Sequence, residues 1–171
     1  MTALRQGSAA LALAALRTAV KDAVSPLGWE LLEADNRYSA WNALASPGNG
    51  GAAMVFVSME EPQDQAHRAL VSKLTVAVVL AGRKHFLDPA AARIAARASG
   101  GGLEDAADRV KGAVLSMSLP PQVLPNPACA VPRYEGRNEL VLPDGIPLDG
   151  CELRFSMMLA ERFSPQCVEN E

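Results

Sequence analysis

The chain has 171 residues, of which 49% are hydrophobic and only 5% aromatic, and its formal net charge is −3. That length fits one domain with its own core, and a negative chain without a Lys/Arg cluster among aromatic residues argues against nucleic-acid recognition. No run reaches the roughly 20 apolar residues of a membrane-spanning helix, and the charges of Arg17, Lys21 and Asp22 follow the apolar run Ala9–Leu16 too closely for a signal peptide.

The N-terminal region predicts one amphipathic helix followed by a short strand. Ser8 is the expected N-cap, and apolar residues at helical spacing continue to about Val24. The breaker sequence 25–28 ends the helix, and Trp29–Glu33 is the expected strand. The residues 35–51 read as a loop, in which Trp41 is a candidate interface anchor.

A long β-hairpin is the next expected feature. Its predicted strands are Ala53–Met59 and Leu70–Leu80, joined by the polar loop Glu60–Arg68. In the second strand, alternation places apolar residues on one face, which we assign to the core: Leu70, Leu74, Val76, Val78 and Leu80. The other face is mixed, as expected of a sheet side that is partly wetted or covered by a partner.

Two helices, a proline-rich segment and a last strand complete the predicted order. The helices are expected from Asp88 to about Ala98 and from Leu103 to about Met117. Residues 119–147 are predicted to form a proline-rich extended arm, and Cys151–Ala160 alternates like a strand. With residues 161–171 as a flexible tail, the chain is expected to be one α+β domain: a single, mostly antiparallel sheet with helices on one face.

The acidic residues of the predicted loop are the main candidate interface. Glu60, Glu61 and Asp64 are too exposed for a general acid/base pair, which needs a cleft and shifted pKa values. We interpret them as an acidic patch. Arg83 and Lys84, in a small basic cluster at a strand end, are the expected complement on a neighbouring subunit, because head-to-tail contacts join two different patches.

No catalytic, metal or cofactor site is predicted. The glycine-rich residues 99–102 follow a helix and precede acidic residues, so a helix linker is favoured over a phosphate loop. Cys129, Cys151 and Cys167 lack metal-ligand spacing and read as reduced thiols. A small enzyme that pairs Cys151 or Cys167 with a histidine stays an alternative, although alternation places Cys151 on the core face.

The ordered elements resemble the tail terminator, or tail-completion, proteins of long-tailed bacteriophages of the lambda type. The resemblance rests on the N-terminal helix, the hairpin segments Met54–Glu61 and Leu74–Leu80, the helical pair and the closing strand Glu152–Leu159. It covers most of the chain but is architectural, without a diagnostic short motif. The proline-rich residues 119–147 depart from the smaller family members, so no individual binding residue is carried over.

The resemblance implies a structural assembly protein of the virion, without a cofactor, that is assembled in the host cytoplasm. Such proteins form a homo-hexameric ring that caps the tail tube at its head-proximal end. The implied partners are the tail tube protein and the head–tail connector protein, with no membrane and no direct nucleic-acid recognition. Another neck, connector or minor tail protein is the first alternative, and a stand-alone binding domain is a further one.

Overall fold

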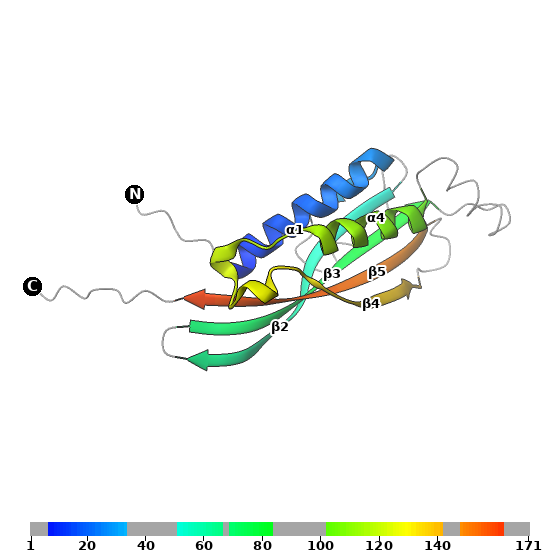
Figure 1. Ribbon diagram of the computed structural model, residues 1–171. Helices are drawn as coiled ribbons and strands as arrows, with labels where there is room; N and C mark the ends of the chain where they lie inside the picture. The colour runs from blue at the N-terminus through cyan, green and yellow to red at the C-terminus, as the bar shows by residue number, and fades with distance from the viewer. Residues whose placement is uncertain (1–6, 34–50, 67–68, 84–101, 142–147, 163–171) are drawn as a thin grey trace, which may run out of the picture.

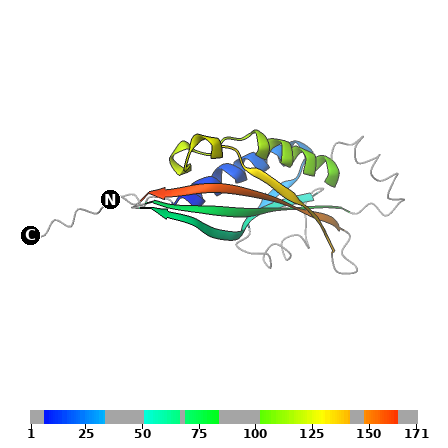
Figure 2. The same cartoon turned by 60° about the horizontal axis from the view of Figure 1, so that its bottom comes forward.

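A five-stranded sheet with two helices on one of its faces forms the described part of the computed structural model, which comprises residues 7–33, 51–66, 69–83, 102–141 and 148–162. Figures 1 and 2 show both helices on the same side of the sheet. This α+β arrangement was predicted from the sequence and is confirmed. The helices and strands are α1 (Ser8–Val24), β1 (Glu30–Leu32), β2 (Gly51–Ala66), β3 (Ala69–Arg83), α4 (Leu103–Ser116), β4 (Arg133–Leu140) and β5 (Leu148–Arg162).

The strand order is β1-β2-β3-β5-β4. Only β1 and β2 run parallel, and the other neighbouring pairs are antiparallel. The two longest antiparallel ladders, β2–β3 and β3–β5, share β3, which therefore lies at the centre of the sheet. The outer positions belong to β4 and, over three residues only, to β1.

The first helix agrees with its predicted range, but Ser8 does not cap it. Gly7 occupies the N-cap position. The Ser8 hydroxyl instead donates a hydrogen bond of 2.8 Å to the Ala160 carbonyl, which fastens the start of α1 to the end of β5. At the other end Gly28 has a φ of 71°, a left-handed conformation that glycine adopts at little cost, and the chain turns there toward β1.

The hairpin is longer than predicted, and the expected loop Glu60–Arg68 is wrong. β2 continues to Ala66, which is paired with Ala69 in β3. Polar residues extend the strand here because β3 is held on its other side by β5, so the backbone ladder forms without apolar alternation. The ladder shifts register at two places, between Val57 and Met59 and between Pro62 and Asp64.

The main core lies between the helices and the sheet. α1 and α4 each bury one apolar stripe, and β3 and β5 direct alternate residues into the same layer, as predicted. A second, smaller cluster lies on the opposite face near β1 and consists of Ala52, Met54, Phe56, Ala77, Val79 and Ala81. The mixed face of the hairpin therefore has a buried apolar part and a wetter part, where Lys73 and Thr75 are half-buried.

The proline-rich segment packs on the core and then becomes a strand. Two short 3-10 turns, Pro121–Val123 and Pro127–Cys129, precede β4, and the side chain of Val123 is buried. β4 lies within residues 119–147, which were predicted to form an extended arm, so this strand is a correction to that prediction. The predicted tail 161–171 begins too early, because β5 continues to Arg162, and the predicted loop 35–51 ends one residue too late, because β2 begins at Gly51. The rest of that tail and loop and the expected helix at 88–98 lie outside the described residues.

Candidate interaction surface

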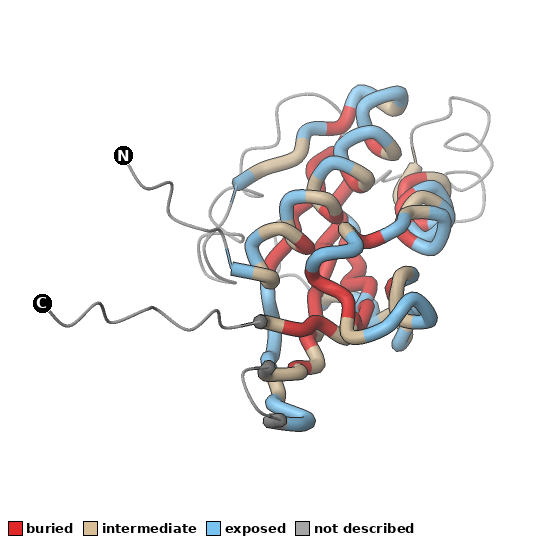
Figure 3. Tube along the Cα trace, turned by 60° about the vertical axis from the view of Figure 1, so that its left-hand side comes forward, coloured by how far each residue is buried: buried red, intermediate tan, exposed pale blue. Residues whose placement is uncertain are grey.

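The distal half of the β2–β3 hairpin, Val57–Ala66 with Ala69–Thr75, is a polar arm at the end of the molecule opposite to β1 (Figure 1). Within the arm, β2 is mostly exposed, whereas Gly51–Phe56 of the same strand are buried. Figure 3 shows this contrast, with red concentrated where the helices cover the sheet. Val57 and Met59 expose 40% and 49% of their surface, so the arm also presents apolar side chains.

The predicted acidic residues all lie on this arm, on a strand rather than on a loop. Glu60 and Asp64 are exposed and Glu61 is half-buried. Glu61 is directly opposite Lys73 in the ladder, yet the Lys73 ammonium approaches Glu135, at 3.9 Å. Within the described residues, the three carboxylates of the arm form no ion pair, so their charge is directed toward solvent or a partner.

Arg83 lies at the opposite end of the hairpin. It is the last residue of β3 and is paired with Leu148, nine residues beyond the partner of Glu60, or roughly 30 Å along the strand. Within one subunit the acidic arm and Arg83 therefore do not meet. Lys84 and Trp41, the other predicted interface residues, lie outside the described residues, as does the side chain of Arg83.

Charged and hydroxyl groups meet on the helix-free face beside β4. The Ser156 hydroxyl donates a hydrogen bond to the Glu135 carboxylate, and this bond is the main cause that lowers the pKa of Glu135 below its usual value. Lys73 and Arg133 lower that pKa further by their positive charge. Glu135 is therefore ionised at neutral pH, and the nearby positive charges of Lys73 and Arg133 balance its negative charge.

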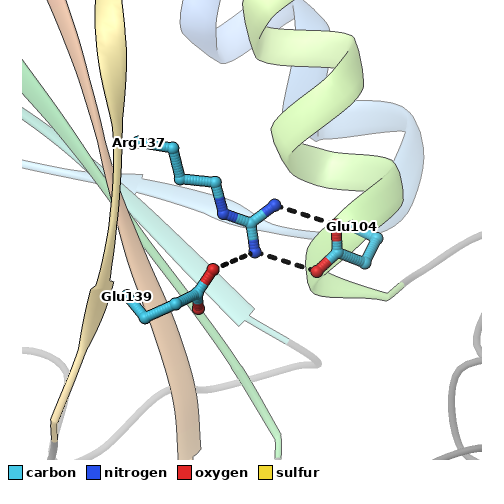
Figure 4. Close-up of polar contacts among 3 residues, drawn as sticks. All are labelled: Glu104, Arg137 and Glu139. Atoms are coloured by element: carbon cyan, nitrogen blue, oxygen red, sulfur yellow. Dashed lines mark hydrogen bonds and ion pairs between the residues drawn. The ribbon is translucent and has the colours of Figure 1, made fainter.

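An arginine clamp joins β4 to the start of α4 on the helix-covered face (Figure 4). The Arg137 guanidinium donates two hydrogen bonds of 2.8 Å to the Glu104 carboxylate and approaches Glu139 at 2.8 Å. The hydrogen bonds to Glu104 are the main cause that raises the pKa of Arg137. Two carboxylates hold this cation in place, so the clamp positions α4 against the sheet edge and leaves Arg137 unavailable for a ligand.

A buried carboxylate lies on the helix-free face of β5. Glu152 is 1% exposed and accepts a hydrogen bond of 2.6 Å from Arg154, whose side chain is 45% exposed. An ionised group at this depth must be paired to be tolerated. The pair lies between the buried apolar cluster near β1 and the wetter part of the same face.

The thiols do not form a catalytic site among the described residues. Cys151 is buried, and burial raises its pKa to about 12, so its thiolate is scarce at neutral pH. Cys129 is half-buried with its sulfur 3.6 Å from the Asn126 side-chain oxygen. Cys167 and both histidines, His67 and His85, lie outside the described residues, so the alternative of a thiol–histidine enzyme stays a prediction that is not favoured.

An open groove of about 570 Å³ lies beside the C-terminal half of α1 and β1. Two cations and two carboxylates line it, together with the Trp29 ring: Arg17, Lys21, Glu30 and Glu33. This balance of charge gives no preference for an anion or a cation. None of the described helices is long and apolar enough to cross a membrane, and the described residues hold no group of three potential metal ligands.

No family model matches this chain, and no curated protein does. Among solved structures, a chain of the virion of a native gene transfer agent particle is similar, with 14% identity and a TM-score of 0.46. The match covers 88% of this chain and 98% of that one. A likeness this weak establishes neither family nor function.

The sequence drew attention to the acidic residues, although it placed them on a loop, and it gave no indication of the residues of β4. Arg133, Glu135 and Arg137 lie on an edge strand that buries few apolar side chains, so its sequence lacks the alternation that predicts strands. The glycine at 136 is the local sequence feature that could have indicated a bulge in this segment, and in the structure it has a φ of 145° beside the register shift.

Proposed function

We propose that this chain is a structural protein of a phage tail that assembles into a homo-hexameric ring. In this proposal the ring caps the tail tube at its head-proximal end and joins it to the head–tail connector, as the architectural resemblance implies. The tail tube protein and the connector protein are its proposed partners, and the virion is its proposed location. The observation that carries the proposal is the acidic arm at one end of a subunit whose opposite end bears Arg83.

This separation favours head-to-tail association. A contact that joins two different patches forms a ring when the rotation between subunits closes. The unpaired carboxylates of Glu60, Glu61 and Asp64 are available for a cationic neighbour. Arg83 and Lys84 of the next subunit are the proposed complement, with Trp41 as an anchor, and the half-wetted sheet face is the surface that a neighbour covers.

Electron microscopy of the purified protein, alone and with tail tubes, tests the proposal. We expect six-fold rings, or rings that form on tube ends only. Twelve-fold rings would favour a connector protein, and a monomer that leaves tubes uncapped would contradict ring formation and capping alike. Thiol-dependent turnover, abolished by replacing the cysteines, would favour the enzyme alternative.

A charge-reversal pair sharpens this test. The double variant Glu60→Lys/Glu61→Lys should assemble less readily than the wild type, because it removes the acidic half of the contact. The matched control is Asp22→Lys/Asp108→Lys, which changes the net charge equally at exposed positions on the two helices. Equal assembly of both variants would contradict a role for the arm.

A further inference from the structure

Two edges of the sheet carry backbone groups that no described strand pairs with. One is the outer edge of β4, which has β5 as its single neighbour among the described strands. The other is the edge of β2 beyond Met54, because β1 pairs with Ala52–Met54 only, whereas β2 continues to Ala66. Unpaired N–H and C=O groups in such a row are a template for another strand.

The two edges differ in charge: Val55–Glu61 of β2 carries two carboxylates and no cation, whereas β4 carries two arginines and two glutamates. The carboxylate of Glu135 in β4 already accepts a hydrogen bond from Ser156 and lies near Lys73. A contact between two β2 edges would place the carboxylates of one arm near those of its copy, and like charges opposite each other are destabilising. Pro62 lacks a backbone N–H and limits the useful edge to the seven residues Val55–Glu61. β4 has eight residues, a matching length, and begins with the exposed cation Arg133.

The direction of the strands also fits. β2 and β3, β3 and β5, and β5 and β4 are each antiparallel, so β4 runs opposite to β2 after three reversals. In a copy related by rotation about a ring axis, the β4 edge therefore meets the β2 edge in the antiparallel sense, and the sheet continues from one subunit into the next.

The bulges select one register. β2 carries an extra residue at Ser58, between Val57 and Met59, and β4 carries one at Glu135, between Tyr134 and Gly136. A single bulge moves every later side chain to the other face unless the partner strand compensates for it. Placing Arg133 opposite Glu61 also places Gly136 opposite Ser58, so the two irregular sites face each other.

In this register the faces agree along the whole contact. Arg133 and Glu61 both lie on the helix-free face, because Arg133 is paired with Ser156 and Glu61 with Lys73. Beyond the bulges, Arg137 is opposite Val57 on the helix-covered face. If β4 is shifted by two residues relative to β2, each bulge lies opposite a regular part of the other strand. Some side chains of the helix-free face then lie opposite side chains of the helix-covered face.

The same contact covers apolar surface. Val57 and Met59 are two of the exposed large hydrophobic residues among the described ones, and both lie inside the seven-residue stretch. A strand laid along this edge removes part of their surface from water. Charge, length, bulge position and exposed apolar area therefore agree on the same partner.

We propose that β4 of one subunit pairs with Val55–Glu61 of β2 in a second copy, with Arg133 opposite Glu61. This inference rests on the proposed self-assembly, but it assigns Arg133 in place of Arg83 and Lys84 as the complement of Glu61. In a copy placed in this register, Arg83 lies eight residues along β3 from Thr75, which is level with Arg133, and therefore does not reach Glu61. Within one subunit Arg133 lies at the same height in the sheet as Met59, because Arg133 is paired with Ser156, Ser156 with Thr75 and Thr75 with Met59. Between subunits Arg133 is opposite Glu61, so each copy is displaced by two residues along the strand direction.

Disulfide cross-linking of the full-length chain tests the register. Directly opposed residues of antiparallel strands have Cα atoms about 4.5–5.5 Å apart, which suits a disulfide. Cys129 and Cys167 are replaced by serine, and the buried Cys151 is kept. We expect a Glu61→Cys chain mixed with an Arg133→Cys chain to form a linked dimer on mild oxidation. A chain with both substitutions should give a ladder of linked species.

Three controls make the result decisive. Each single variant alone, and Glu61→Cys mixed with Lys21→Cys, should show only collisional cross-linking. Efficient linking of Glu61→Cys with itself would overturn the proposal in favour of a β2–β2 contact. Rings that cap tubes without the expected link would overturn this edge contact but leave the proposed function standing. A ladder of linked species that leaves tubes uncapped would support the edge contact and overturn the proposed capping function.

A charge swap gives an independent readout. Glu61→Arg and Arg133→Glu should each raise the concentration needed for half-assembly by roughly fivefold, the effect of a direct like-charge pair across strands. The combined variant restores the pair and should return assembly near the wild-type level. Failure of the combined variant to recover, with circular dichroism unchanged, would contradict direct opposition of the two residues.

Discussion

The two halves of the β2–β3 hairpin share one backbone ladder but have opposite surroundings. Near β1, Gly51–Phe56 of β2 are buried against apolar clusters on both faces of the sheet. In the arm, β2 continues with exposed and charged residues while it keeps its pairing to β3. A central, doubly paired strand can therefore extend a neighbour beyond the core: burial stabilises the first part of β2, and pairing with β3 continues the strand into an exposed second part.

Matched valines measure the difference between the halves. Val57 and Val76 are paired directly across the two strands, but they are 40% and 0% exposed. We expect Val76→Ala to lower the free energy of unfolding by about 2 kcal/mol through lost burial and a small cavity. Val57→Ala should cost less than about 0.5 kcal/mol, as surface substitutions do.

Denaturant unfolding at a concentration below assembly is the measurement for both valines. The cooperative slope should stay constant, because neither change alters the extent of the fold. Equal losses for the two variants would mean that the arm is packed as tightly as the core, and the contrast between the halves would disappear.

The Arg137 clamp tests how firmly β4 is held beside the core. Arg137→Lys should lower the free energy of unfolding by about 1–2 kcal/mol, because an ammonium cannot form the two-pronged pair with Glu104 while it also contacts Glu139. Thermal unfolding is the measurement. The control is Arg109→Lys, because Arg109 is exposed and its partner Asp105 lies one turn away on the same helix. This variant should lower the free energy of unfolding by no more than about 0.3 kcal/mol.

If Arg137→Lys and its control have the same stability, the clamp contributes no more than a surface ion pair. β4 would then be a loosely attached edge. That result would weaken the proposal that β4 offers a preformed strand to a neighbouring copy, because an unheld strand must be ordered when it binds.

The Cys151 thiol reports burial of the core half by its pH dependence. Burial raises its pKa to about 12, and the unfolded thiol has a pKa of about 8.5, so the folded state holds the proton over a range in which the unfolded state loses it. The free energy of unfolding should therefore fall as pH rises from about 8.5 toward 12, by up to about 1.4 kcal/mol per pH unit.

Unfolding measured at pH 8 and pH 10, in the wild type and in Cys151→Ala, isolates this effect, because the alanine variant lacks the thiol. In parallel, alkylation at pH 8 should modify Cys129 before Cys151. Rapid labelling of Cys151 in the folded protein would show that the sheet opens at this strand and would contradict a rigid core half.

The sequence predicted the elements that bury a periodic apolar face. α1, α4 and the inner parts of β2, β3 and β5 all carry such a face, since apolar spacing of 3.6 or 2 residues reports burial against one layer. It failed where strands form without burial. β4 and the arm of β2 are stabilised by backbone pairing with a neighbour distant in sequence, and their own residues read as a loop or an extended arm.

The candidate surface divides in the same way. The acidic cluster of Glu60, Glu61 and Asp64 was visible as charge without a catalytic setting, and the structure places it on a strand. The proposed role of Arg133 in β4 could not be predicted from the sequence. It depends on Arg133 being the first residue of an edge strand, and on that strand having a bulge like the one in β2. No local pattern in one segment reports the bulge of another.

The α+β class, the helix-covered core and the acidic character of the hairpin could be predicted from the sequence alone. These follow from composition and period, which act locally along the chain. The three-dimensional arrangement of the strands was needed to show that the hairpin extends into an arm, that β4 forms the far edge, and that the two edges match in length and bulge position. Strand pairing joins residues far apart in sequence, and its register depends on both partners at once.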